Sequence, residues 1–225
     1  KPKPAWKTNL QSILGRGAVG HSGPASAHFD GKQFHNIEPK PHKNLWSLLK
    51  WQFSRAPQPD WIEQPGPAIP PTIQQRVTGS QLQVTYINHA TLLIQQHGLN
   101  ILTDPVWSER VSPFQFVGPK RHHPPGLSLE QLPPIDLILV SHNHYDHLDL
   151  DSLSQLAVRF PQAQVVTGLG NAALISESGF SQVDEMDWWQ SIVLSPQLTL
   201  HAVPVQHWSA RTRSDTNQTL WLGFV

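Results

Sequence analysis

A dense group of potential metal ligands lies in the middle of the sequence, in the stretch 141–147 (SHNHYDH). Neutral imidazole nitrogens and carboxylate oxygens are ligands that zinc and similar divalent ions prefer in proteins. Three histidines and one aspartate in so short a stretch are costly to hold together unless they share a cation. We therefore interpret this stretch as a metal-binding motif in preference to a solvated polar loop.

The spacing within the motif predicts two neighbouring metal sites. His142 and His144 are two residues apart, so in an extended loop they project to the same side and can bind one ion. Asp146 and His147 follow, and a turn of the chain lets them face a second ion. Two-metal hydrolases hold their ions roughly 3.5–4 Å apart and activate water between them. The motif therefore predicts such a hydrolase, with Asp146 as both a ligand and the candidate catalytic residue.

A further candidate ligand, His207, follows a predicted strand at Leu198–Val205. Its place at a strand end is the same as that of the motif, so it can complete the site of His142 and His144. A histidine that only caps the strand is the alternative interpretation.

Regular elements on both sides position the motif. The apolar run Ile135–Val140 predicts a buried strand before it, and the amphipathic stretch Asp149–Phe160 predicts a helix after it. Further strands are predicted at Leu82–Ile87, Thr91–Gln96, Leu99–Thr103, Gln164–Thr167 and Ser191–Leu194, with a short helix at Asn171–Ser178 and a hairpin turn at His97-Gly98. Alternating strands and helices indicate an α/β fold with sheet packed between helices.

A long loop, Trp107–Pro134, precedes the motif strand. Loops beyond about 12–15 residues without regular structure are usually functional or disordered, so we interpret this one as a candidate wall of the substrate pocket. Its Lys120 and Arg121 would suit an anionic group such as phosphate, and plain surface residues are the alternative.

Composition excludes several function classes. The 225 residues contain 16 Lys+Arg and 16 Asp+Glu with no long run of one sign, so we expect no nucleic-acid partner. The absence of cysteine excludes disulfides, thiol nucleophiles and cysteine-type zinc sites. No apolar run approaches the roughly 18 residues of a membrane span. Nine tryptophans hint at a lipid-facing surface, although we expect most of them to lie in the core.

The first 80 residues differ from the rest in composition and predict an irregular N-terminal arm, rich in Pro, Gly, His and Lys. We expect aromatic anchors within it at Trp6, Phe29 and Phe34. Four of its histidines recur every seven residues, which we attribute to chance because glycine and proline interrupt any helix there: His21, His28, His35 and His42. The stretch Asn44–Phe53, with Asn44 as N-cap, predicts a short amphipathic helix that we expect to pack on the domain, membrane contact being the alternative.

Several strings in the second domain-sized part, residues 81–225, carry a family resemblance. They are Asn88–Thr91, Ile101–Pro105, Ser108–Arg110, Gly118–Arg121, Ser141–Asp149, Asp187–Trp189 and Gln206–Trp208. Their combination, over about residues 45–225, resembles the N-acyl-phosphatidylethanolamine-hydrolysing phospholipase D family and its bacterial relatives, within the metallo-β-lactamase fold superfamily. The resemblance implies an αββα sandwich of two sheets, of which residues 81–225 would form the N-terminal portion.

The resemblance also implies a site and a reaction. His142, His144 and His207 would bind one zinc, and Asp146 and His147 would bind another, with two zinc ions in the complete protein. A metal-bound hydroxide would attack the phosphodiester of a phospholipid-like substrate and release phosphatidic acid and an N-acylethanolamine. A metallo-hydrolase of another ester or lactone, and a non-catalytic metal- and lipid-binding envelope protein, are the alternatives.

Tyr145 is placed by the motif to donate a hydrogen bond to such a substrate, and a structural tyrosine is the alternative. A lipid substrate favours a membrane-associated or cell-envelope location over the free cytoplasm, with a possible membrane surface as partner and an oligomer left open. These expectations depend on the resemblance alone.

Two ligands of the superfamily pattern have no counterpart in the sequence: a bridging aspartate in a Gly-Asp-Thr-Gly-like turn and a final histidine. Asp215, in a polar loop, does not match the bridging position. The sequence ends in Trp221–Val225, which resembles the middle of a strand and would leave an unpaired sheet edge. We therefore expect the C-terminal half of the fold to be missing from this chain, and we do not expect hydrolysis by this chain alone.

Overall fold

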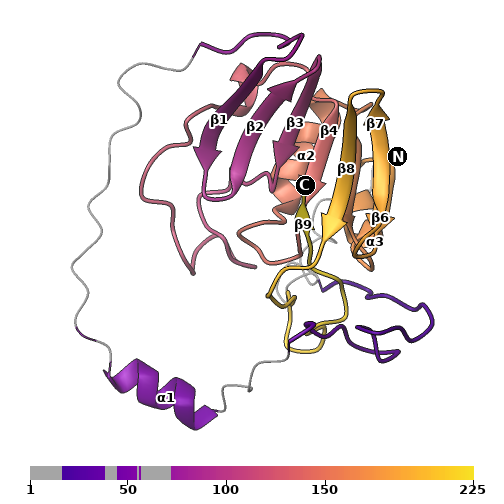
Figure 1. Ribbon diagram of the computed structural model, residues 1–225. Helices are drawn as coiled ribbons and strands as arrows, with labels where there is room; N and C mark the ends of the chain where they lie inside the picture. The colour runs from indigo at the N-terminus through magenta and orange to yellow at the C-terminus, as the bar shows by residue number, and fades with distance from the viewer. Residues whose placement is uncertain (1–16, 39–44, 55, 57–71) are drawn as a thin grey trace, which may run out of the picture.

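The computed structural model describes residues 17–38, 45–54, 56 and 72–225. In this part of the chain two β-sheets lie face to face, and helices cover the outer face of the larger sheet (Figure 1). The elements are α1 (Leu45–Ser54), β1 (Leu82–Asn88), β2 (Thr91–Gln96), β3 (Leu99–Thr103), the 3₁₀ turn η2 (Leu129–Gln131), β4 (Leu137–Val140), α2 (Leu150–Arg159), β5 (Gln164–Gly168), α3 (Ala172–Ser176), β6 (Val183–Met186), β7 (Ser191–Ser195), β8 (Leu198–Val203) and β9 (Gly223–Phe224). The predicted α/β class of the metallo-β-lactamase type is confirmed.

The larger sheet has the strand order β1-β2-β3-β4-β5-β6, antiparallel in its first half and parallel from β3 onward. The antiparallel half is built by two-residue turns. His97 and Gly98 join β2 to β3 with φ of 49° and 79°, as a type I′ hairpin turn requires, so the predicted hairpin is confirmed. The β1–β2 turn likewise holds His89 at a φ of 43°.

Three strands of this sheet end at one edge. Because β2 is antiparallel to both β1 and β3, and β3 is parallel to β4, the strands β1, β3 and β4 all point the same way. His89 follows β1, Asp104 follows β3, and Ser141 begins the loop after β4. Ligands of open α/β sheets bind outside the carboxyl ends of the strands, so this edge is where a site is expected.

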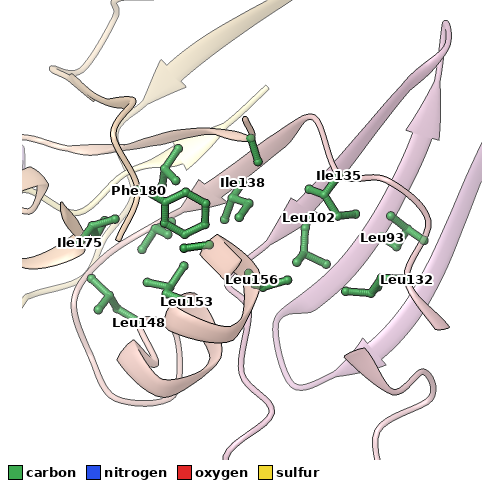
Figure 2. Close-up of a cluster of buried hydrophobic side chains, with 14 of the residues drawn as sticks. Leu93, Leu102, Leu132, Ile135, Ile138, Leu148, Leu153, Leu156, Ile175 and Phe180 are labelled. Atoms are coloured by element: carbon green, nitrogen blue, oxygen red, sulfur yellow. The ribbon is translucent and has the colours of Figure 1, made fainter. Parts of the chain in front are cut away.

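Strand β4 is buried on both faces, which explains its uninterrupted apolar sequence. Ile138 belongs to the core between the larger sheet and α2, where Leu153 and Leu156 lie (Figure 2). Leu137 and Leu139 belong to the core between the two sheets. Each such side chain contributes about 1.5–3 kcal/mol relative to exposure, so β4 fixes the start of the motif loop firmly.

Helix α2 begins and ends as the sequence predicts. Asp149 is its N-cap and accepts a hydrogen bond from Asp151 N, and Phe160 is its C-cap. Asp149 also accepts hydrogen bonds from Ser108 N at 3.1 Å and Ser152 Oγ at 2.5 Å. The cap therefore ties the motif loop to the start of the long loop.

Some elements differ from the expectation. Strand β6 was not predicted, because its sequence Val-Asp-Glu-Met carries two acids and it lies at the edge of the parallel half. Helix α3 is shorter than predicted, and β8 ends at Val203 instead of Val205. The predicted C-terminal strand is present as β9, at the edge of the smaller sheet, which has the order β7-β8-β9.

The described part of the N-terminal arm packs on the domain, and its two predicted anchors in this part are confirmed. Phe29 and Phe34 are buried in the core between the sheets and are joined by an isolated β-bridge. The anchor predicted at Trp6, the N-cap predicted at Asn44, and His42 lie outside the described residues.

Helix α1 contradicts the prediction that it packs on the domain, because Trp46 and Phe53 are 79% and 86% exposed. The expectation of mostly buried tryptophans is also wrong for the described chain. Trp188 and Trp221 are buried, whereas four others are exposed: Trp46, Trp51, Trp189 and Trp208. Within the described residues no helix has both the length and the apolarity to cross a membrane.

Candidate metal centre

His142, His144 and His207 form a compact group, called here the three-histidine cluster. His142 Nε2 lies 2.9 Å from His144 Nδ1 and 2.9 Å from His207 Nε2, and His207 Nε2 lies 3.3 Å from His144 Nδ1. The motif loop after β4 supplies two of these rings, and the loop after β8 in the other sheet supplies the third. The structure thus brings together the three histidines that the sequence assigned to one ion.

His89, Asp146 and His147 form a second group, called here the mixed cluster. Asp146 Oδ2 lies 3.2 Å from His89 Nε2 and 3.8 Å from His147 Nε2. The rings of His142 and His147 are 4.1 Å apart between centroids, so the two clusters are neighbours. Sequence reasoning assigned Asp146 and His147 to a second ion and missed His89.

Asp104 orients one ring of each cluster. Its Oδ2 accepts hydrogen bonds from Ser141 Oγ at 2.7 Å and from His147 Nδ1 at 2.8 Å, and its Oδ1 accepts one from Ser141 N at 2.7 Å. Ser141 Oγ in turn lies 2.9 Å from His142 Nδ1. A carboxylate behind a ligating histidine is the usual device that fixes ring orientation at metal sites.

These contacts favour one tautomer of His142. The single hydroxyl proton of Ser141 is donated to the Asp104 carboxylate. The Ser141–His142 bond must therefore be donated by His142 Nδ1–H, which leaves Nε2 with a bare lone pair that faces His144 and His207. A cation would satisfy these converging nitrogens, so the residues present fit a metal ion.

The environment keeps the three-histidine cluster neutral. Burial lowers the pKa of His144 to about 4, and the neighbouring His207 adds to the effect. Burial also lowers the pKa of His142 and of His207, with further lowering from His147 in both cases. Neutral imidazoles are the form that binds metal, so no proton has to leave these rings near pH 7.

His147 behaves differently. Burial lowers its pKa, but the hydrogen bond and charge of Asp104, together with the charge of Asp146, outweigh burial and raise the pKa above its usual value. Because Asp104 accepts a hydrogen bond from Nδ1, Nε2 is the ring nitrogen of His147 that faces the mixed cluster.

Arg211 binds backbone carbonyls of the motif loop, and sequence reasoning missed it. Its Nη1 donates hydrogen bonds to Asn143 O at 3.0 Å and Leu148 O at 2.7 Å, and its guanidinium carbon lies 4.0 Å from the centre of the Tyr145 ring. The Tyr145 hydroxyl donates to Arg211 O at 3.1 Å. These contacts favour the structural interpretation of Tyr145 over substrate binding.

Lys120 and Arg121 are engaged in the long loop. Lys120 Nζ lies 3.1 Å from Glu109 Oε1 at the surface, and Arg121 donates hydrogen bonds to Trp107 O at 3.0 Å and Ser108 O at 3.2 Å. The isolated bridge between Arg110 and Lys120 adds order to this loop.

The remaining sequence candidates lie apart from both clusters. Asp215 is buried and accepts backbone hydrogen bonds from Arg211, Thr212 and Ala18. The regularly spaced histidines of the arm do not gather: in the described chain, His28 contacts Asp187 and His35 contacts Asp30.

Comparison with known proteins agrees with the motif. The family model described as "Beta-lactamase superfamily domain" matches residues 99–225. An uncharacterized protein of Mycobacterium tuberculosis (strain H37Rv) is 39% identical over 180 residues, covering 79% of this chain and 47% of that protein. The N-acyl-phosphatidylethanolamine-hydrolyzing phospholipase D 1 of Caenorhabditis elegans is 37% identical over 154 residues, covering 65% and 43%. The mitochondrial N-acyl-phosphatidylethanolamine-hydrolyzing phospholipase D of Saccharomyces cerevisiae is 33% identical over 160 residues, covering 69% and 34%. The chain therefore spans less than half the length of each of these relatives.

Proposed function

Since the chain belongs to the metallo-β-lactamase fold superfamily, we propose that it carries the metal centre of a metal-dependent hydrolase. More narrowly, we propose a phosphodiesterase of phospholipase D type that acts on N-acyl-phosphatidylethanolamine-like lipids. The observation that carries the proposal is the convergence of two ligand clusters at the carboxyl edge of the larger sheet. The names of the worm and yeast relatives support the lipid substrate.

We assign one ion to the three-histidine cluster and a second to Asp146 and His147, with His89 as a further donor within this chain. Zinc is the proposed metal because it binds small sets of imidazole nitrogens and carboxylate oxygens such as these. Iron also accepts this donor set. When bound, the ions supply Lewis-acid activation of water and offset the charge that develops on the phosphoryl oxygens.

The residues of the chain have separate tasks in this proposal. Asp104 fixes the rings of His142 and His147, so that their Nε2 lone pairs face the two clusters. Asp146 is the proposed catalytic residue, because its carboxylate lies at the mixed cluster and its side chain keeps 39% of its exposure to solvent.

The surroundings of the clusters suit a lipid phosphodiester. The ring of Trp208 lies 4.3 Å from that of His144 and is half exposed, so it offers an apolar contact beside the three-histidine cluster. Of the two basic residues predicted to bind the anionic group, Lys120 is the proposed direct contact and Arg121 a supporting residue. Lys120 would exchange the carboxylate of Glu109 for phosphate, whereas Arg121 would act mainly by holding the loop.

A membrane-associated location is part of the proposal. The exposed Trp46, Trp51 and Phe53 of α1 are side chains that favour a membrane–water interface. Binding of the intact gene product to vesicles of neutral phospholipid, measured by co-sedimentation, checks this part.

The decisive experiment follows hydrolysis by the intact gene product. Vesicles containing N-acyl-phosphatidylethanolamine are incubated with the zinc-loaded protein, and release of N-acylethanolamine and phosphatidic acid is measured by mass spectrometry. We expect release that a chelator abolishes, that zinc restores and that His207→Ala removes. The matched control is His201→Ala, an exposed histidine on β8 outside both clusters.

The outcomes separate the levels of the proposal. Hydrolysis of a lactone or carboxylic ester panel without lipid hydrolysis would leave the hydrolase and remove the phospholipase. Metal binding and vesicle binding without hydrolysis of any substrate would remove the hydrolase and favour the non-catalytic envelope protein.

A further inference from the structure

We propose that the N-terminal arm is a working part of the metal centre, because Asn36 positions His207. Asn36 Nδ2 donates a hydrogen bond to His207 O at 2.8 Å, and His207 N donates one back to Asn36 Oδ1 at 3.1 Å. One carboxamide thus binds both backbone polar groups of a predicted metal ligand. The inference rests on the proposed metal site and adds a residue that neither the motif nor the family model, which begins at residue 99, contains.

The reciprocal pair explains why a carboxamide is present at this position. The side chain must donate to a carbonyl and accept from an N–H at the same time, and asparagine and glutamine are the residues that offer both on adjacent atoms. Asn36 Oδ1 also accepts a hydrogen bond from Trp221 Nε1 at 3.1 Å, and the same indole N–H contacts Val205 O at 3.0 Å. Asn36 therefore joins the loop that carries His207 to the buried Trp221.

The arm holds Asn36 firmly enough to act in this way. Phe34, two residues before Asn36, is fully buried between the sheets, and its N–H donates to Asn217 O at 2.7 Å. His28 Nε2 lies 2.7 Å from Asp187 Oδ1, and its ring stacks on Trp188 with centroids 4.5 Å apart. The arm is thus fixed to the domain on both sides of its own β-bridge.

His142 and His207 are held by different parts of the chain. His142 is oriented by Ser141 and Asp104, which belong to the larger sheet. His207 lies four residues beyond the end of β8, and Asn36 fixes its backbone. Loss of the Asn36 carboxamide should therefore displace one ligand of the three-histidine cluster and leave the mixed cluster intact.

Two variants test the inference in the intact gene product: Asn36→Ala, which removes the carboxamide, and Asn36→Asp, which keeps its shape but loses the donor to His207 O. Gln33→Ala is the matched control, because Gln33 lies on the same arm and donates to Thr216 O at 3.0 Å, away from His207. Zinc affinity is measured by competition with a chromophoric chelator. The absorption spectrum of the cobalt-loaded protein reports the coordination of each site.

We expect both Asn36 variants to bind one zinc equivalent about 10- to 100-fold more weakly, as is usual when a residue that orients a ligand is lost. The cobalt spectrum should change for that equivalent alone, and Gln33→Ala should match the parent protein. Circular dichroism of the metal-free variants shows whether each is folded.

The alternatives are distinguishable. If His207→Ala loses one bound zinc ion while both Asn36 variants bind zinc like the parent protein, the positioning role of Asn36 is wrong and the metal centre stands. If Asn36→Asp is folded and weakens both equivalents equally, Asn36 has only a general structural role. If the parent binds neither zinc nor cobalt, the proposed function itself fails.

Discussion

The carboxylate of Asp104 lies 2.8 Å from the ring nitrogen Nδ1 of His147, and through Ser141 it also orients His142. One buried acid therefore serves both ligand clusters. Its backbone has a φ of 36°, which asparagine tolerates better than most residues. Asp104→Asn thus changes the charge and the hydrogen-bond pattern with little backbone strain.

We expect Asp104→Asn to weaken binding of both zinc equivalents by about 10- to 100-fold, because the amide cannot accept from His147 and Ser141 as the carboxylate does. Competition with a chromophoric chelator measures the effect. Asp184→Asn is the control, since Asp184 accepts a hydrogen bond from Gln164 at the far strand β6. Weaker zinc binding at only one of the two clusters would contradict the role of Asp104 in both.

His89 gives a more selective prediction. His89→Ala should lower the metal affinity of the mixed cluster by about 10-fold or more and leave the affinity of the three-histidine cluster unchanged. The reason is that His89 contacts Asp146 and belongs to the mixed cluster, whereas His144 and His207 belong to the other. Cobalt titration of the variant beside His97→Ala, which alters the other hairpin turn, measures this. Unchanged binding of both equivalents would show that His89 is no ligand.

Arg211 predicts a stability effect at the motif loop. Replacing it by Met keeps much of the volume but leaves the carbonyls of Asn143 and Leu148 without their charged donor, which should cost roughly 2–4 kcal/mol of unfolding free energy. Urea unfolding measures the loss. Arg213→Met, at an exposed position nearby in sequence, should change the midpoint little. Equal urea midpoints for the two variants would show that the hydrogen bonds of Arg211 to the motif loop do not stabilise the fold.

The metal-free protein should lose stability in mild acid. The pKa of His144 is about 4 in the folded state and 6.5 is its ordinary value, so between these values the unfolded chain binds more protons. The free energy of unfolding should therefore fall as pH decreases from 6.5 to 4. His142 and His207 act in the same direction, whereas the raised pKa of His147 contributes stability that is lost as pH rises through that pKa.

Urea midpoints measured in a chelator between pH 7 and 4.5 check this slope, with His144→Asn as the comparison. The variant should show a smaller decrease than the parent over that window. An identical decrease would mean that His144 binds protons equally in the folded and unfolded states, which would contradict its lowered pKa.

The sequence predicted the elements that flank the motif, and the grouping of its side chains, because these features are local. Four ligand candidates lie in one loop after a continuous apolar strand, and the cap at Asp149 marks the helix that follows. The two-residue turn at His97-Gly98 is equally local. Each of these features depends on neighbours in sequence, which is where propensity and spacing carry information.

The other parts of the site could not be found in this way. His89 and Asp104 reach the motif only because β1 and β3 end at the same sheet edge as β4. Asn36 reaches His207 across 171 residues of sequence, and nothing in its neighbourhood marks it. The order of strands in the larger sheet and the docking of the arm decide these contacts. Neither can be predicted from the local periodicity of the sequence.

The contact between Asn36 and Trp221 spans 185 residues, which bears on how the protein is made. At about 5–20 residues per second, a ribosome needs roughly 10–40 seconds to synthesise the chain between them. During the first part of that time Phe29 and Phe34 lack the partners of their core, such as Ile101 and Leu137, which are synthesised later. The two-residue turns can form early, whereas the hydrogen bonds of Asn36 to His207 and Trp221 can form only after those residues have been synthesised. The full set of contacts that supports the backbone of His207 is thus available only after Trp221 has been synthesised.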